Sequence, residues 1–399
     1  MSQPSLYNEI MQMPVIDTHT HLVGNKLCAN DFWEISDYFW LNRELQSAGY
    51  PADADRLPQE ERAAAFVSAY HGSRNTMMNR AFTAIMKNLY EIALTDAESV
   101  LKANETVKQK RNTADWAQHV ADRLNVVRFV VNHPDHAAFA GMREDALLLP
   151  RIDSWLPELA RKIADSSGAS RQSAFEYTKR TISDQLQSYQ AMGSPGIMTT
   201  LSAYEASAHE AYELSDNSSI DEITMMLLHE ICSELQERGM FLQLFLGIER
   251  GWGTDSAAPV NNSLRIVKLY GLFESYSIAF ELVVASELNN MDIVQAAWNF
   301  PNVHVGGMWW YNFRPSTYLQ SMQYRLEAIA PLKSSLVVSD ARCIEWTYGK
   351  LLLVKELLAH FLDKQVENGW ISREDALYSA SEWLHGSAAK RYGLTNSTR

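Results

Sequence analysis

Two histidines separated by one residue, His19 and His21, stand near the N-terminus of the chain. The β-rich run Val15–Thr18 directly before them predicts a strand that ends at this pair. Residues i and i+2 of a strand face the same side, so both imidazoles can bind one metal ion. A purely structural pair is the alternative, because 11 histidines in 399 residues produce about 0.3 such pairs by chance. The adjoining strand favours the metal site.

A carboxylate far along the chain, Asp340, ends the apolar run Leu336–Asp340. At that position it could complete the metal site and also accept a proton from a water or a substrate hydroxyl. The alternative is a helix N-cap, a common place for aspartate after a strand. Together with the histidine pair, the position favours a metal ligand and catalytic base.

Eight apolar, β-rich runs would position these residues. Most are continuous rather than alternating, which is typical of strands buried on both faces of a parallel sheet. Helical patterns separate most of them. The runs are Val15–Thr18, Val126–Asn132, Leu147–Arg151, Ile197–Leu201, Phe241–Gly247, Ile278–Val284, Val303–Met308 and Leu336–Asp340. Eight strands alternating with helices predict a (β/α)8 barrel of the TIM type, whose active face lies at the carboxyl ends of the strands.

Two regions exceed the minimal barrel. Residues 31–122 are mostly helical in pattern and are expected to form an insertion after the first strand. Residues 343–395 are expected to add helices at the C-terminal end. We expect the whole chain, 1–399, to form one domain, since barrels of this kind often exceed 250 residues.

The charge and the cysteines limit the classes of protein and partner. With 35 Lys+Arg against 48 Asp+Glu, the formal net charge of −13 disfavours nucleic-acid binding. No apolar run reaches the roughly 20 residues that a membrane helix needs, and no signal peptide is recognisable. The three cysteines form no Cys-x-x-Cys pair, which favours a reduced, cytoplasmic protein.

Further motifs follow along the chain. Asp37–Ala48 starts the expected helical insertion and Ala388–Tyr392 belongs to the last expected helix, while Leu148–Asp153, Gln243–Arg250, Phe300–Tyr311 and Ser339–Arg342 lie at expected strands. With the His-Thr-His segment, they resemble the uronate isomerase family of the amidohydrolase superfamily. The resemblance is patchy but runs nearly end to end, and the motifs keep their order. It implies a metal-dependent barrel enzyme that interconverts aldose and ketose forms of a uronate.

The resemblance also implies roles for two arginines and for a metal. Arg151 and Arg342 would bind the carboxylate or hydroxyls of a small acidic substrate, because guanidinium forks suit planar carboxylates. His19, His21 and Asp340 would hold one divalent metal ion. Imidazole and carboxylate ligands suit zinc, while manganese, iron and nickel remain open.

The chain departs from the family at several pocket positions. Phe39, Thr200 and Phe245 stand where the family has histidines, and Asn132-His133-Pro134 replaces an Asp-Asp-Pro segment. A phenyl ring neither donates nor accepts a hydrogen bond. We therefore predict a flatter or less hydroxylated acid as substrate, with aromatic walls from Phe39, Phe245 and a tryptophan.

Three more residues have two interpretations each. His133 is either a general acid or base at the mouth of the second strand or a loop histidine. Trp309 either lines the pocket or packs between barrel and helices. Arg250, beside Glu249, either contacts the substrate or forms a surface ion pair.

Two enzymatic functions remain open, and a third possibility is a barrel without chemistry. The first is a sugar-acid isomerase-like enzyme. The second is a metal-dependent hydrolase of an amide, ester or lactone in which Asp340 shuttles the proton. The retained histidines, Asp340 and arginines argue against a non-catalytic barrel. The oligomeric state stays open, with a homo-oligomer among the outcomes.

Overall fold

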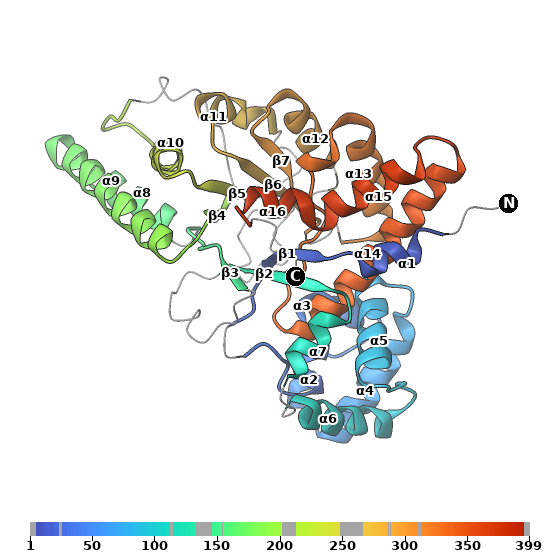
Figure 1. The fold of residues 1–399 in the computed structure, drawn as a ribbon. Helices are drawn as coiled ribbons and strands as arrows, with labels where there is room; N and C mark the ends of the chain where they lie inside the picture. Colours follow the sequence, from blue (N-terminus) through green and yellow to red (C-terminus); the bar gives the residue numbers. More distant parts are fainter. Residues whose placement is uncertain are drawn as a thin grey trace.

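The computed structural model describes residues 5–23, 26–111, 115–132, 146–153, 155–201, 213–247, 266–285, 287, 289–309 and 313–394. Within these ranges the chain is a mixed α/β protein with two parallel sheets, ordered β1-β2-β3 and β4-β5-β6-β7 (Figure 1). The strands are β1 (Val15–Thr20), β2 (Val126–Val131), β3 (Ala146–Leu148), β4 (Gly196–Leu201), β5 (Phe241–Leu246), β6 (Phe280–Val284) and β7 (Val303–Val305). Every residue of β1, β5 and β6 is buried, which confirms the prediction of parallel strands covered on both faces.

The segment predicted as the eighth strand, Leu336–Asp340, forms no regular strand. It lies between β7 and β1, to which its flanks are joined by two isolated parallel bridges. One bridge pairs Val305 with Ser334, and the other pairs Thr20 with Ala341.

Local backbone geometry explains the irregular pairing of this segment. Asp340 has a left-handed φ of 53°, which interrupts an extended strand, and the β1–β2 register shifts between Asp17 and Thr20. A similar isolated bridge, between Arg151 and Met198, joins the end of β3 to β4. The sheet edges are therefore linked by single bridges instead of continuous ladders.

The predicted helical insertion corresponds to a group of helices that packs below the strands in Figure 1. These helices are α2 (Phe32–Ser36), α3 (Phe39–Ser47), α4 (Gln59–Gly72), α5 (Met77–Leu89), α6 (Ala97–Arg111) and α7 (Trp116–Asp122), with the 3-10 turn Ala54–Arg56. The long helix α14 (Ile344–Glu367) packs against α5 and α7, so the C-terminal part of the chain and the insertion form one layer. Whether this layer belongs to a single domain with the sheets stays a prediction.

The other helices surround β4–β7 or close the chain. Around the sheets lie α1 (Tyr7–Gln12), α8 (Leu156–Ala164), α9 (Gly168–Ala191), α10 (Ile220–Arg238), α11 (Tyr270–Ser275), α12 (Asn289–Asn299) and α13 (Pro315–Ala328), with the 3-10 turns Ile266–Leu269 and Pro331–Lys333. The chain ends in α15 (Arg373–Ser381), a π-helical turn at Glu382–Gly386 and α16 (Ser387–Arg391). The Ser372 hydroxyl caps the start of α15 by accepting from the Asp375 amide at 3.0 Å.

Apolar side chains from both sheets meet in the interior between the strands. Ile16, Val130, Met198, Phe245 and Val283 belong to this inner cluster. A buried ion pair at 2.9 Å between Arg391 of α16 and Glu281 of β6 joins the terminal helix to the same interior. Polar side chains at the carboxyl ends of the strands are therefore carried by strands whose interior is closely packed.

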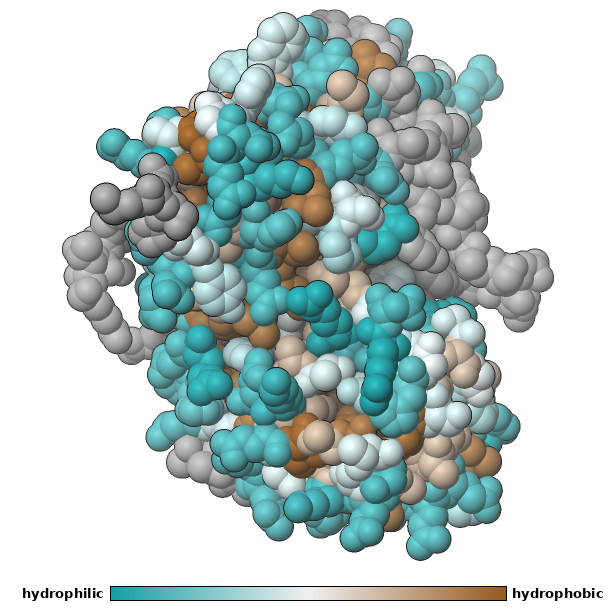
Figure 2. All heavy atoms as spheres, turned by 90° about the vertical axis from the view of Figure 1, so that its right-hand side faces the viewer, coloured by the Kyte–Doolittle hydropathy of each residue, from teal (hydrophilic) through white to brown (hydrophobic). Residues whose placement is uncertain are grey.

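Hydrophilic residues dominate the face drawn in Figure 2, with hydrophobic residues in scattered groups. None of the described helices combines the length and the apolar character that crossing a membrane requires.

Candidate metal centre

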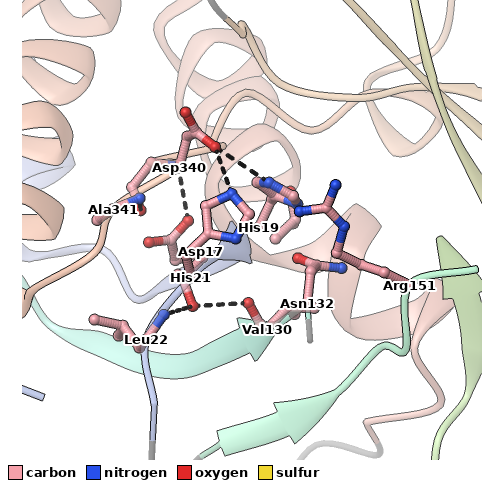
Figure 3. A network of polar contacts seen from close by, with 12 residues as sticks. Asp17, His19, His21, Leu22, Val130, Asn132, Arg151, Asp340 and Ala341 are labelled. Atoms are coloured by element: carbon pink, nitrogen blue, oxygen red, sulfur yellow. Dashed lines mark hydrogen bonds and ion pairs between the residues drawn. The ribbon is translucent and has the colours of Figure 1, made fainter. Parts of the chain in front are cut away.

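Three ligating side chains converge at the carboxyl end of β1. One atom each from His19, His21 and Asp340 lies within 4.8 Å of the others. Asp340 Oδ1 is 3.3 Å from Nε2 of His19 and 3.0 Å from Nε2 of His21 (Figure 3). The two imidazoles meet edge to face, with ring centroids 4.9 Å apart. Both nitrogens thus point at the same carboxylate oxygen, as ligands of a common ion would.

The backbone explains this convergence of residues that are more than 300 positions apart. The Asp340 amide donates to the His19 carbonyl at 2.9 Å, and the His21 amide donates to the Ala341 carbonyl at 2.8 Å. Asp340 itself adopts the left-handed conformation, which disfavours side chains other than glycine by about 1 kcal/mol. Aspartate tolerates this conformation better than most residues, and such strain concentrates at functional sites.

Burial and hydrogen bonding set the charge state of the cluster. Burial lowers the pKa of His19 to about 4, so its imidazole is neutral near pH 7, the form that binds metals. Burial alone would raise the pKa of Asp340, but hydrogen bonds with His19 and His21 hold it well below its usual range. An ionised carboxylate and a neutral imidazole are therefore ready to act as ligands at neutral pH.

An aromatic wall stands directly against the histidines. The Phe245 ring, fully buried at the end of β5, lies 4.5 Å from the His19 ring. Trp309 packs edge to face on Phe245, with ring centroids 4.7 Å apart. Trp309 is therefore buried in the interior cluster of the strands, beside Phe245, and a contact with substrate stays a prediction.

Arg151 lies beside the cluster, at the end of β3, with Asn132 on the same side of the histidines (Figure 3). Its Nε and Nη2 donate to the two carboxylate oxygens of Asp153, at 3.1 and 2.8 Å. Its positive charge contributes to the low pKa of His19. Asp153 thus fixes one edge of the guanidinium, and substrate contact would use the remaining nitrogen.

The other predicted substrate residues that the structure describes, Arg342 and Phe39, are both exposed. Arg342 is exposed, and its charge acts on the phenol of Tyr38, which hydrogen-bonds the Asp340 carbonyl. Phe39 is exposed at the start of α3, with Trp40 packed on its ring and Arg43 over it. Its role as a pocket wall stays a prediction.

Two predicted site residues, His133 and Arg250, lie outside the described residues. Their proposed roles as acid or base and as substrate contact stay predictions.

A layer of polar residues that was not predicted from the sequence lies behind the cluster. Asp17 is buried, and burial raises its pKa to about 6, although its Oδ1 accepts from the Ser339 amide at 2.9 Å. Lys350 of α14 is buried as well, and burial lowers its pKa to about 8. A lysine in the apolar stretch 344–354 was the available sequence signal, since charged residues are rarely buried without a partner.

No family model matches the chain, and no curated protein matches it in sequence. Solved structures do match over nearly the whole length. Uronate isomerase from Thermotoga maritima is 16% identical, with 97% of this chain and 96% of that chain covered and a TM-score of 0.80. Glucuronate isomerase from Caulobacter crescentus is 15% identical, with 98% and 93% covered and a TM-score of 0.79.

A proposed metal-dependent hydrolase from Lactobacillus casei ATCC 334 is also similar. It is 13% identical, with 99% of each chain covered and a TM-score of 0.62. The predicted resemblance to uronate isomerases is therefore confirmed at the level of structure. This chain shares the fold of those proteins from end to end at low sequence identity.

Proposed function

We propose that this chain is a metal-dependent enzyme of the amidohydrolase type, built on a (β/α)8 barrel, that acts on a small carboxylate-bearing substrate. Leu336–Asp340 would be the eighth strand position of the barrel, and the bridges at its flanks support this assignment. The observation that carries the proposal is the convergence of His19, His21 and Asp340 within 4.8 Å.

The donor set of this cluster fits a divalent ion. Two imidazoles and one carboxylate suit zinc and several first-row metals, and three protein ligands leave room for a substrate. Among the described residues, the buried Nδ1 of His19 has no hydrogen-bond partner, and this nitrogen would carry the imidazole proton when Nε2 binds a metal. A bound metal would supply Lewis-acid polarisation of the substrate's oxygen atoms.

The remaining residues would bind and orient the substrate. Arg151, held by Asp153, would offer its free edge to a carboxylate, and exposed Arg342 would supply a second positive charge. Asp340, ionised at neutral pH, would move a proton between substrate atoms. Phe245 and Trp309 would exclude water on the opposite side and leave few partners for substrate hydroxyls.

These roles fit an isomerase-like reaction on a sugar acid or a related, less hydroxylated acid. Hydrolysis of an amide, ester or lactone is the second candidate. In that reaction the ionised Asp340 carboxylate would accept a proton from an attacking water. The similarity to a proposed hydrolase at a TM-score of 0.62 is compatible with either reaction.

Product analysis tests the proposal. The protein, loaded separately with zinc and manganese, is incubated with a panel of uronates, aldonolactones and N-acyl amino acids, and products are followed by NMR. An isomerised acid supports the first candidate and a cleaved lactone or amide the second. If Asp340→Asn turns over the same substrate at the wild-type rate, the proposed site is wrong.

A further inference from the structure

Two side chains from separate helical regions hold the backbone on which the third ligand is carried. Lys350 of α14 is 2% exposed, and its Nζ donates to the Tyr38 hydroxyl at 2.7 Å and to the Ser339 carbonyl at 2.5 Å. The Tyr38 hydroxyl in turn donates to the Asp340 carbonyl at 3.1 Å. Two consecutive carbonyls, those of Ser339 and Asp340, are therefore fixed by one Lys–Tyr pair.

This support acts where the backbone conformation is least favourable. Asp340 has a φ of 53°, so its conformation depends on the contacts around it. From the other side, the Asp17 carboxylate accepts from the Ser339 amide at 2.9 Å. With Ser339 and Asp340 held from both sides, the Asp340 side chain keeps Oδ1 in front of both imidazoles.

We propose that Tyr38 and Lys350 are positioning residues of the metal centre, which hold Asp340 in its ligating conformation. The inference rests on the proposed metal site. Tyr38 and Lys350 hydrogen-bond backbone carbonyls, those of Asp340 and Ser339, so both act through the segment that carries the ligand. Tyr38 lies between α2 and α3 of the insertion and Lys350 lies in α14, so these two helical regions would support the metal site.

The chain contains a matched control for a purely structural role of Lys350. Lys355 lies on the same helix, is equally buried, and donates to the carbonyls of Met11, Met13 and Leu124. Those acceptors precede β1 and β2, at the strand ends opposite to the cluster. Replacing Lys355 should therefore lower stability without changing the geometry of the metal ligands.

The test compares zinc affinities of metal-free wild type, Tyr38→Phe, Lys350→Met and Lys355→Met, by competition with a chromogenic chelator. We expect Tyr38→Phe and Lys350→Met each to weaken zinc binding by about 10- to 100-fold, the usual effect of losing support behind a metal ligand. Lys355→Met should lower the urea midpoint and leave the zinc affinity of the folded protein within about twofold of wild type.

The outcomes distinguish a failure of this inference from a failure of the proposed metal site. If wild type binds one zinc and both Tyr38→Phe and Lys350→Met bind it equally well, this inference is wrong while the metal site stands. If wild type binds no zinc, the metal site itself is wrong, and the inference with it. Should Lys350→Met not fold, Tyr38→Phe decides, because it removes a single oxygen atom. The visible spectrum of its cobalt form should then differ from that of wild type.

Discussion

Replacing both histidines by glutamine should abolish metal binding and leave the fold intact. The Nε2 atoms of His19 and His21 now lie 3.3 and 3.0 Å from Asp340 Oδ1. A glutamine amide nitrogen can reach about the same place, so the buried carboxylate keeps hydrogen-bond donors. The amide nitrogen has no lone pair available for a metal, and with that nitrogen facing the carboxylate the amide oxygen points away, which leaves Asp340 as the one remaining ligand of the three.

The expected size of the effect follows from binding linkage. A metal present at 100 times its Kd stabilises the folded state by about 2.7 kcal/mol. At about 2.1 cal/mol/K per residue, unfolding of 399 residues carries an entropy of about 0.8 kcal/mol/K. The same metal should therefore raise the Tm of wild type by about 3 °C and that of the double variant by nearly nothing.

Elemental analysis and thermal scans measure both effects. Wild type purified without chelator should contain close to one equivalent of metal, and His19→Gln/His21→Gln less than about a tenth. Circular dichroism of the variant controls for folding. Full metal occupancy in a folded double variant, or an equal rise in Tm on adding metal, would refute the assigned ligands.

Three further predictions follow from the geometry of the site. Arg151→Met should lower kcat/KM on the acidic substrate at least 10-fold, a loss of ~1.4 kcal/mol or more; an equal loss on the neutral ester of that substrate would contradict a carboxylate contact. Because Phe245 offers no hydrogen bond to a sugar hydroxyl, kcat/KM for D-glucuronate should stay below ~10⁴ M⁻¹s⁻¹, and a higher value would show that this wall was misinterpreted. Burial raises the pKa of Asp17 from 3.8 to about 6, so between these pH values the folded protein binds a proton that the unfolded protein does not. The free energy of unfolding of wild type, relative to that of Asp17→Asn, should therefore rise as the pH falls from 6 towards 3.8. Urea denaturation of the metal-free proteins should show wild type gaining about 2 kcal/mol on the variant between pH 7 and 4.5, and no change in the difference would contradict the buried carboxyl.

Much of the metal site could be predicted from sequence because its signals are local. His19 lies in β1 and His21 directly follows its last residue, so the i, i+2 spacing of an extended chain predicts that both face one side. Asp340 was placed by the same logic, at the end of an apolar run. The runs themselves were recognisable because strands buried on both faces are apolar at nearly every position.

The support behind the ligands could not be predicted in the same way. Tyr38 and Lys350 are more than 300 residues apart and meet only because α14 packs along the insertion. The left-handed conformation of Asp340 is likewise decided by its surroundings, since aspartate alone has no preference strong enough to impose it. The irregular pairing of the eighth segment could likewise not be predicted from its apolar composition.

The aromatic wall shows the same division between sequence and structure. The sequence by itself determined that position 245 carries a phenylalanine and that its strand is buried. Only the tertiary structure decided that its ring packs on His19 at 4.5 Å, while Phe39, predicted for the same wall, is exposed and packs on Trp40. Periodicity states which way a side chain points within its own element, but the neighbour it meets depends on how distant elements pack, and that is set by the free energy of the whole fold.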